Sequence, residues 1–142
     1  MKYANEPGSL FWIGTCWKAT SISEFWRRWN PVVSDENANV LKWIHQRTAN
    51  RFVITTSIFT IFLFWGLIHD GFIFLTNNLL HTNRSFEFSF TYFFCLNAVA
   101  VILDKNLSFS LPLPNRLKTI LVFLWLLGSL RYRHLIVYYL FF

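Results

Sequence analysis

The apolar stretch from Phe52 to Leu75 restricts the possible folds of this chain more than any other feature. A helix over these residues is about 36 Å long, enough to cross the roughly 30 Å hydrocarbon core of a bilayer with some tilt. Hydrophobic residues make up 54% of the sequence and charged residues only 14%, whereas soluble domains usually carry about 25% charged residues. We therefore expect an all-α membrane protein.

Two weaker apolar runs follow, at about 88–103 and 117–130. With the run at about 52–75 they predict about three transmembrane helices, which together form a transmembrane segment over residues 51–142. Residues 1–50 are more polar and are expected to form interfacial helices at the membrane surface.

The third run leaves two interpretations open. It is interrupted by Gly128-Ser129 and by the basic stretch 131–134, before an apolar tail at 135–142. Either one span contains buried arginines, or a short span is followed by an interfacial tail, and we favour the second. The sequence assigns no role to the polar residues of the basic stretch, which are Arg131, Arg133 and His134.

Within residues 1–50, two local signals define a short helix. Ser21-Ile22-Ser23-Glu24 matches a capping box, so a helix should begin near Ser21. Pro31 disfavours helical geometry at the residue before it, so the helix should end at Asn30.

A second helix is expected further along, because Val40, Leu41 and Ile44 form an apolar stripe flanked by basic residues. This pattern is typical of an amphipathic helix that lies on a membrane surface.

Basic residues are distributed unevenly around the predicted spans. The 76–87 connection has Arg84 alone, whereas the region before the first span and the 104–118 loop hold many more. By the positive-inside rule, the N-terminus and the 104–118 loop are predicted to be cytoplasmic, in the cell membrane if the organism is bacterial. The basic residues on that side are Lys2, Lys18, Arg27, Arg28, Lys42, Arg47, Arg51, Lys105, Arg116 and Lys118. With a net charge of +6, the expected partners are membrane lipids and not nucleic acid.

His69 is the first candidate for chemistry, because an ionisable side chain inside a span is costly and is a functional hypothesis by default. A neutral imidazole could act as a general base for a hydroxyl, although a purely structural histidine is the alternative. Asp70 projects about 100° around the helix from His69, so the two do not form a ready His–Asp pair.

Asn30 and its neighbours are the second candidates. The Asn30 amide could donate to a developing oxyanion, or it could simply be a turn residue before proline. Arg27 and Arg28 could bind a phosphate or carboxylate, or anchor the chain at the interface beside Trp26 and Trp29. No histidine, cysteine or carboxylate spacing indicates a metal site.

Phe25-Trp26-Arg27-Arg28-Trp29-Asn30, followed after an amphipathic segment by Gly66-Leu67-Ile68-His69-Asp70-Gly71, resembles the core of the membrane-bound O-acyltransferases. The resemblance covers about residues 20–75. It implies that His69 is the catalytic base and Asn30 its polar partner, with Trp26, Arg27, Arg28 and Trp29 binding substrate. It also implies an acyl thioester such as acyl-CoA as donor, a hydroxyl acceptor, and no further cofactor.

Members of that family carry more spans than this chain offers, which keeps two other interpretations open. The chain could be a shortened, inactive relative that serves as a lipid-binding or accessory subunit, partnered by a larger multi-span protein or by copies of itself. It could also be a structural membrane subunit whose tryptophans and arginines are only interface anchors.

Overall fold

The computed structural model describes residues 16–80, 88–106 and 113–141, without the side chains of Pro31, Val32, Asn106 and 132–141. Within these residues the protein is all-helical, as predicted, with no strand. Residues 1–15 of the predicted interfacial segment, and Phe142 of the predicted tail, lie outside the described part. The helices are α2 (Ile22–Trp29), α3 (Pro31–Arg47), α4 (Arg51–Leu79), α5 (Ser89–Asn106) and α6 (Asn115–Phe141).

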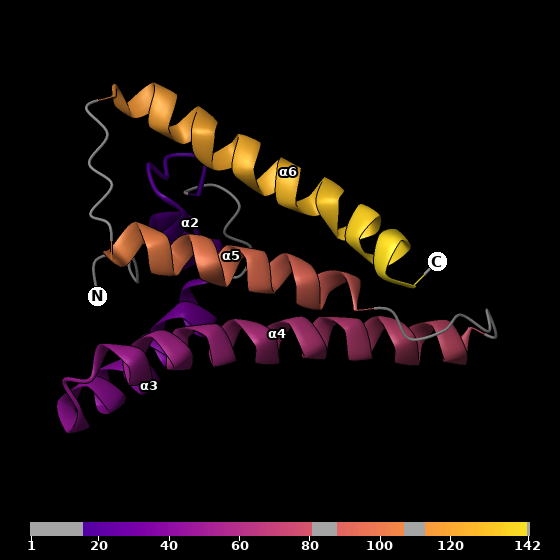
Figure 1. The fold of residues 1–142 in the computed structure, drawn as a ribbon, viewed down its shortest axis with the longest axis horizontal. Helices are drawn as coiled ribbons and strands as arrows, with labels where there is room; N and C mark the ends of the chain where they lie inside the picture. The colour runs from indigo at the N-terminus through magenta and orange to yellow at the C-terminus, as the bar shows by residue number, and fades with distance from the viewer. Residues whose placement is uncertain (1–15, 81–87, 107–112, 142) are drawn as a thin grey trace.

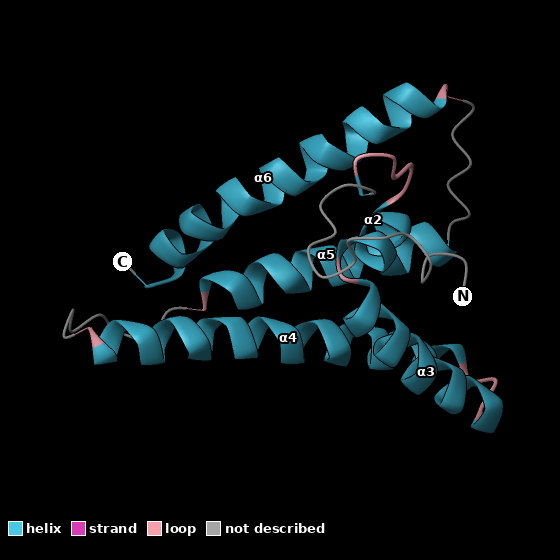
Figure 2. Cartoon of the chain, turned by 180° about the vertical axis from the view of Figure 1, so that it is seen from behind, coloured by secondary structure: helices cyan, strands magenta, loops and turns pink. Residues whose placement is uncertain are grey.

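α4, α5 and α6 lie one above another in Figure 1, with α5 in the middle. α4 and α5 form the most extensive helix pair, and α6 packs on α5. α2 fills the space at one end of this stack, and α3 leads from α2 to the beginning of α4, as the view from behind also shows (Figure 2). α2 contacts both α5 and α3.

α4 includes the predicted first span and extends it at both ends. Within the described part of the chain, it is the one helix that is both long enough and apolar enough to cross a membrane. Many of its large apolar side chains face outward; Phe64 is 56% exposed and Phe72 67%. α6 continues through Gly128-Ser129 and residues 131–134, so the third apolar run and most of the predicted tail belong to one helix.

Local chemistry defines the short helix α2 as predicted. The Ser21 hydroxyl accepts from the Glu24 N–H at 3.1 Å, which makes Ser21 the N-cap. The Glu24 carboxylate, however, accepts from the Thr20 N–H at 2.8 Å and from the Thr20 hydroxyl at 2.9 Å. In the usual capping box, the glutamate accepts from the N–H of the N-cap residue itself. Here Glu24 accepts from Thr20, the residue before the N-cap.

The α4–α5 contact depends on two residues one turn apart on α4, Gly66 and Asp70. A Cβ atom on Gly66 would lie 2.6 Å from the Thr91 Cα atom, so only glycine permits this approach. Asp70 is buried and accepts from the Phe90 N–H at 2.8 Å and from the Thr91 N–H and hydroxyl at 2.7 Å each. It thereby caps the N-terminus of α5.

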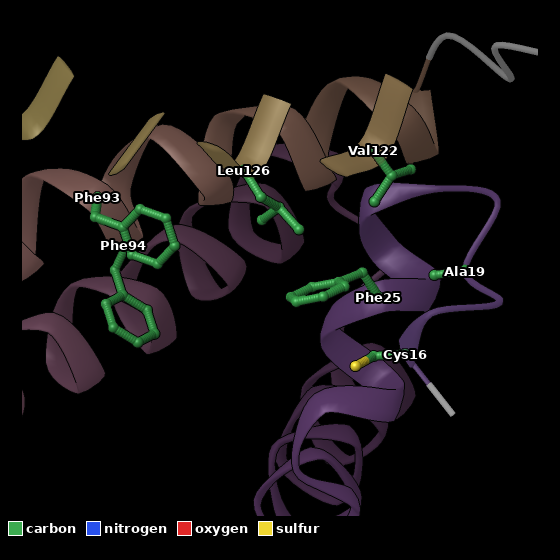
Figure 3. Close-up of a cluster of buried hydrophobic side chains, with 7 residues drawn as sticks. All are labelled: Cys16, Ala19, Phe25, Phe93, Phe94, Val122 and Leu126. Carbon is green, nitrogen blue, oxygen red and sulfur yellow. The ribbon is translucent and has the colours of Figure 1, made fainter. Parts of the chain in front are cut away.

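The buried core lies where α2, α5 and α6 meet. Phe25 of α2 packs with side chains of the turn that precedes α2 and with side chains of α5 and α6. Figure 3 shows these side chains pointing toward one another. The cluster consists of Cys16, Ala19, Phe25, Phe93, Phe94, Val122 and Leu126. This core fixes α2 against the stack and so determines where the end of α2 lies.

Candidate functional site

A cavity of about 480 Å³ lies among α2, α3, α4 and α5. Its wall on the α4 and α5 side is largely apolar and aromatic, including Ile61, Phe62, Trp65 and Phe94. Its wall on the α2 and α3 side is largely polar. The polar lining residues there are Ser21, Ser23, Glu24, Arg27, Asn30, Ser34, Asp35 and Asn37. Such a cavity suits a ligand with one polar and one apolar part.

His69 lines this cavity from α4. Its Nδ1 atom lies 2.7 Å from the Trp65 carbonyl oxygen one turn earlier. A carbonyl only accepts hydrogen bonds, so Nδ1 carries the proton, and in the neutral ring Nε2 keeps its lone pair. The Phe94 and Phe90 rings pack against the imidazole, with centroids at 5.0 Å and 5.8 Å. The ring is thus held by Trp65 and the two phenylalanines in the tautomer whose Nε2 atom can accept a proton.

Asp70 takes no part in this arrangement. Its carboxylate oxygens are engaged by the N-terminus of α5, whereas His69 bonds to Trp65. His69 and Asp70 therefore have different hydrogen-bond partners.

Asn30 lines the same cavity from the junction of α2 and α3. It ends α2 in extended geometry, as predicted, and is also the N-cap of α3. Its side-chain oxygen accepts from the Val33 N–H at 3.3 Å, which leaves the two N–H donors on the other end of the amide. The structural and the catalytic interpretations of Asn30 are thus compatible, because they use different atoms.

The two arginines differ in their surroundings. Arg27 lines the cavity, its side chain is 60% exposed, and its Nη2 lies 4.0 Å from the Glu24 carboxylate. The Arg28 side chain is only 16% exposed and forms a close ion pair with Glu24. Arg27 is therefore the better placed to bind a ligand.

Burial raises the pKa of Glu24, but the two hydrogen bonds from Thr20 and the charge and hydrogen bond of Arg28 outweigh it. The net effect is a pKa below the usual value for glutamate. Glu24 is consequently a carboxylate at neutral pH; it lines the cavity, and Arg28 balances its charge.

Both predicted tryptophans line the cavity. Trp26 packs against Phe62 and Phe94, each with a centroid distance of 5.3 Å, and Trp29 stacks on Phe25 at 5.4 Å. The indole rings therefore form part of the wall and also join α2 to the core.

Sequence reasoning missed two polar residues close to this site. Asn37 of α3 lines the cavity, and its side-chain oxygen accepts from the Trp65 indole at 3.4 Å. Asn97 of α5 is fully buried, donates to the Phe93 carbonyl at 2.8 Å, and lies 3.4 Å from the Trp26 indole nitrogen. The criterion that selected His69, a polar group inside an apolar run, applies equally to Asn97.

Among the described residues, no group of three histidines, cysteines or carboxylates could hold a metal ion. No protein-family model, no curated protein and no solved structure matches this chain. The function of this protein is therefore inferred from the cavity and from the residues of the two short motifs that line it.

Proposed function

We propose that this protein works within a membrane and transfers an acyl group from a thioester, such as acyl-CoA, to a hydroxyl acceptor in the cavity. The observation that carries the proposal is that His69 of α4 and Asn30, at the junction of α2 and α3, line one cavity. A second observation supports it: the bond to Trp65 leaves the His69 Nε2 atom available as a base.

The proposed membrane placement is supported by α4, which is long and apolar enough to span; in this proposal α5 and α6 are the second and third spans. The outward apolar side chains of α4 and α6, such as Phe72 at 67% and Leu127 at 62% exposure, support it because water would disfavour them. In this orientation the N-terminus and the 104–118 loop face the cytoplasm.

The proposed reaction needs only the chain's own side chains. His69 Nε2 takes the proton of the acceptor hydroxyl, whose oxygen attacks the thioester carbonyl carbon. The Asn30 N–H donors stabilise the resulting oxyanion. The carbon–sulfur bond then breaks, and the proton passes from His69 to the departing sulfur. Arg27 would bind the phosphates of the donor.

A specific observation also favours the need for a partner. Asn37 lies beside Trp65, which is about 21 Å along α4 from Arg51. The neighbouring Glu36 is exposed and is not among the residues that line the cavity, and at that depth a carboxylate against lipid is costly. At the level of Trp65, the α3 side of the protein would therefore face water or another protein, which supports the alternative of an accessory subunit that joins a larger membrane protein or a second copy.

The acyl-transfer proposal is tested on the full chain reconstituted in liposomes, with palmitoyl-CoA as donor and glycerol or water as acceptor. We expect release of free CoA, reduced about 100-fold or more in His69→Gln because a general base contributes at least that factor. Asn30→Ser keeps a good N-cap but removes the amide donors; we expect a loss of about 100-fold there too.

Trp43→Phe is the matched control, because Trp43 is exposed on the far part of α3 and is not among the residues that line the cavity. It should keep wild-type release. Equal CoA release by wild type and His69→Gln would rule the enzyme out. Wild-type activity in Asn30→Ser would reduce Asn30 to its capping role.

A further inference from the structure

A second, apolar groove runs between α3 and the first part of α4. Its volume is about 340 Å³, and it is separated from the cavity by Ile61, which lines both. Val40 and Ile44 form one side, and Phe52, Val53 and Thr60 are on the other.

Two of the three side-chain hydroxyls that line the groove bond to their own helix. The Ser57 hydroxyl donates to the Val53 carbonyl at 2.8 Å, and the Thr60 hydroxyl donates to the Thr56 carbonyl at 2.9 Å. Hydroxyls bonded to their own helix in this way offer little to a polar ligand. The groove therefore suits a hydrocarbon chain.

The length of the groove matches one leaflet of a bilayer. From Phe52 to Ile61, α4 rises about 14 Å, close to half of the roughly 30 Å hydrocarbon core. Arg51 is the first residue of α4 and is exposed. If α4 spans the membrane, Arg51 lies at the level of the lipid headgroups and the groove extends inward from it.

Arg47 lies at the same end. It follows Val40 and Ile44 at helical spacing, so it projects from the groove side of α3. Its guanidinium stacks over the Trp43 ring at 3.8 Å and donates to the Trp43 carbonyl at 3.2 Å. One of its five N–H donors serves that bond. An exposed tryptophan beside arginines is characteristic of the membrane interface.

We propose that this groove binds one anionic phospholipid, with an acyl chain between α3 and α4 and the phosphate on Arg47 and Arg51. Charge complementarity at one end and an apolar wall of leaflet length together fit this ligand. In the proposed orientation this is the cytoplasmic leaflet, where anionic lipids are concentrated. The inference rests on the membrane placement of α4 but not on acyl transfer.

The test uses the full chain in detergent with equal amounts of phosphatidylglycerol and phosphatidylcholine carrying the same chains, and native mass spectrometry counts the lipid retained. We expect the wild type to retain phosphatidylglycerol in preference. Arg47→Gln with Arg51→Gln should lower that retention about fivefold for each arginine and leave phosphatidylcholine unchanged.

Arg116→Gln with Lys118→Gln is the matched control. It removes the same charge from the beginning of α6, away from the groove, and should keep the preference. Thr60→Phe fills the groove and should lower retention of both lipids. Circular dichroism checks that each variant stays helical, and Arg47→Lys with Arg51→Lys, which keeps the charge, should retain the preference.

The inference is overturned if the wild type shows no preference, if the control pair loses it equally, or if Thr60→Phe binds lipid as before. If the variant with both glutamine substitutions fails to fold, lipid retention by the wild type and by Thr60→Phe still tests the inference. CoA release, measured on the same preparations, separates the two proposals. A wild type that releases CoA but shows no lipid preference would reject only the lipid site, and a wild type that prefers phosphatidylglycerol but releases no CoA would reject only acyl transfer.

Discussion

The two sides of α4 are held in different ways. On the α5 side, Gly66 allows backbone to approach backbone, and Asp70 caps the neighbouring helix with three short hydrogen bonds. On the α2 and α3 side, the contacts are aromatic edges and one long hydrogen bond, 3.4 Å from Trp65 to Asn37. The cavity and the groove both lie on this second, looser side. The close α4–α5 contact thus fixes the position of α4, and the cavity and the groove lie on the opposite, less tightly packed side of this helix.

Gly66→Leu should disrupt the close α4–α5 contact and cause the largest loss of stability among these variants. The new side chain would meet the backbone of Thr91, which cannot move aside as a flexible side chain could. We expect a loss of about 3 kcal/mol in stability, the upper part of the range for overpacking. Thermal unfolding in detergent, followed by circular dichroism, measures it.

Gly71→Leu is the control for that experiment, since a Cβ atom on Gly71 has nothing within 4 Å. It should be neutral or stabilising by up to about 1 kcal/mol, because glycine is a poor helix former. Similar destabilisation by both substitutions would contradict the assignment of Gly66 to a backbone contact.

Asp70→Ala should have the next largest effect, about 2 kcal/mol, because it removes a helix cap and leaves buried donors unsatisfied. Its neighbour provides the contrast: His69→Gln, on an exposed residue, should change stability by under about 0.5 kcal/mol. The same unfolding assay compares them. If His69→Gln were the more damaging, the division of α4 into a supporting and a functional side would be wrong.

This pair of neighbours also shows what the sequence can predict. The ends of α2 follow from chemistry within a few residues, the Ser21 cap and the proline after Asn30, and both predictions are confirmed. The role of Asp70 depends on Phe90 and Thr91, which belong to another helix beyond a loop. Asn97 is a mixed case: its place inside an apolar run is visible in the sequence, but its partners Trp26 and Ser129 come from α2 and α6.

Arg28 is a different case, since the necessary signal is local. Glu24 and Arg28 are four residues apart in a predicted helix, a spacing that favours an ion pair. The resemblance of the whole motif implies a substrate role for Arg28, and in the structure this side chain forms the ion pair that its spacing from Glu24 favours.

The Glu24–Arg28 ion pair gives the smallest expected effect on stability. Its dependence on pH tests whether charge helps to hold α2. Because the folded protein lowers the pKa of Glu24, the charged carboxylate stabilises the fold at any pH above its unfolded value, about 4.3. This contribution is lost as the pH falls through the lower, folded value. Since the pair is partly exposed, we expect it to be worth under about 1 kcal/mol.

The measurement compares the stability of wild type and Glu24→Gln at neutral pH and at progressively more acidic pH. Other carboxylates titrate in both proteins, so the difference between the two isolates Glu24. That difference should be largest at neutral pH and should shrink in acid. A difference that stays constant with pH would mean that Glu24 supports α2 through its shape and its bonds to Thr20 instead of its charge.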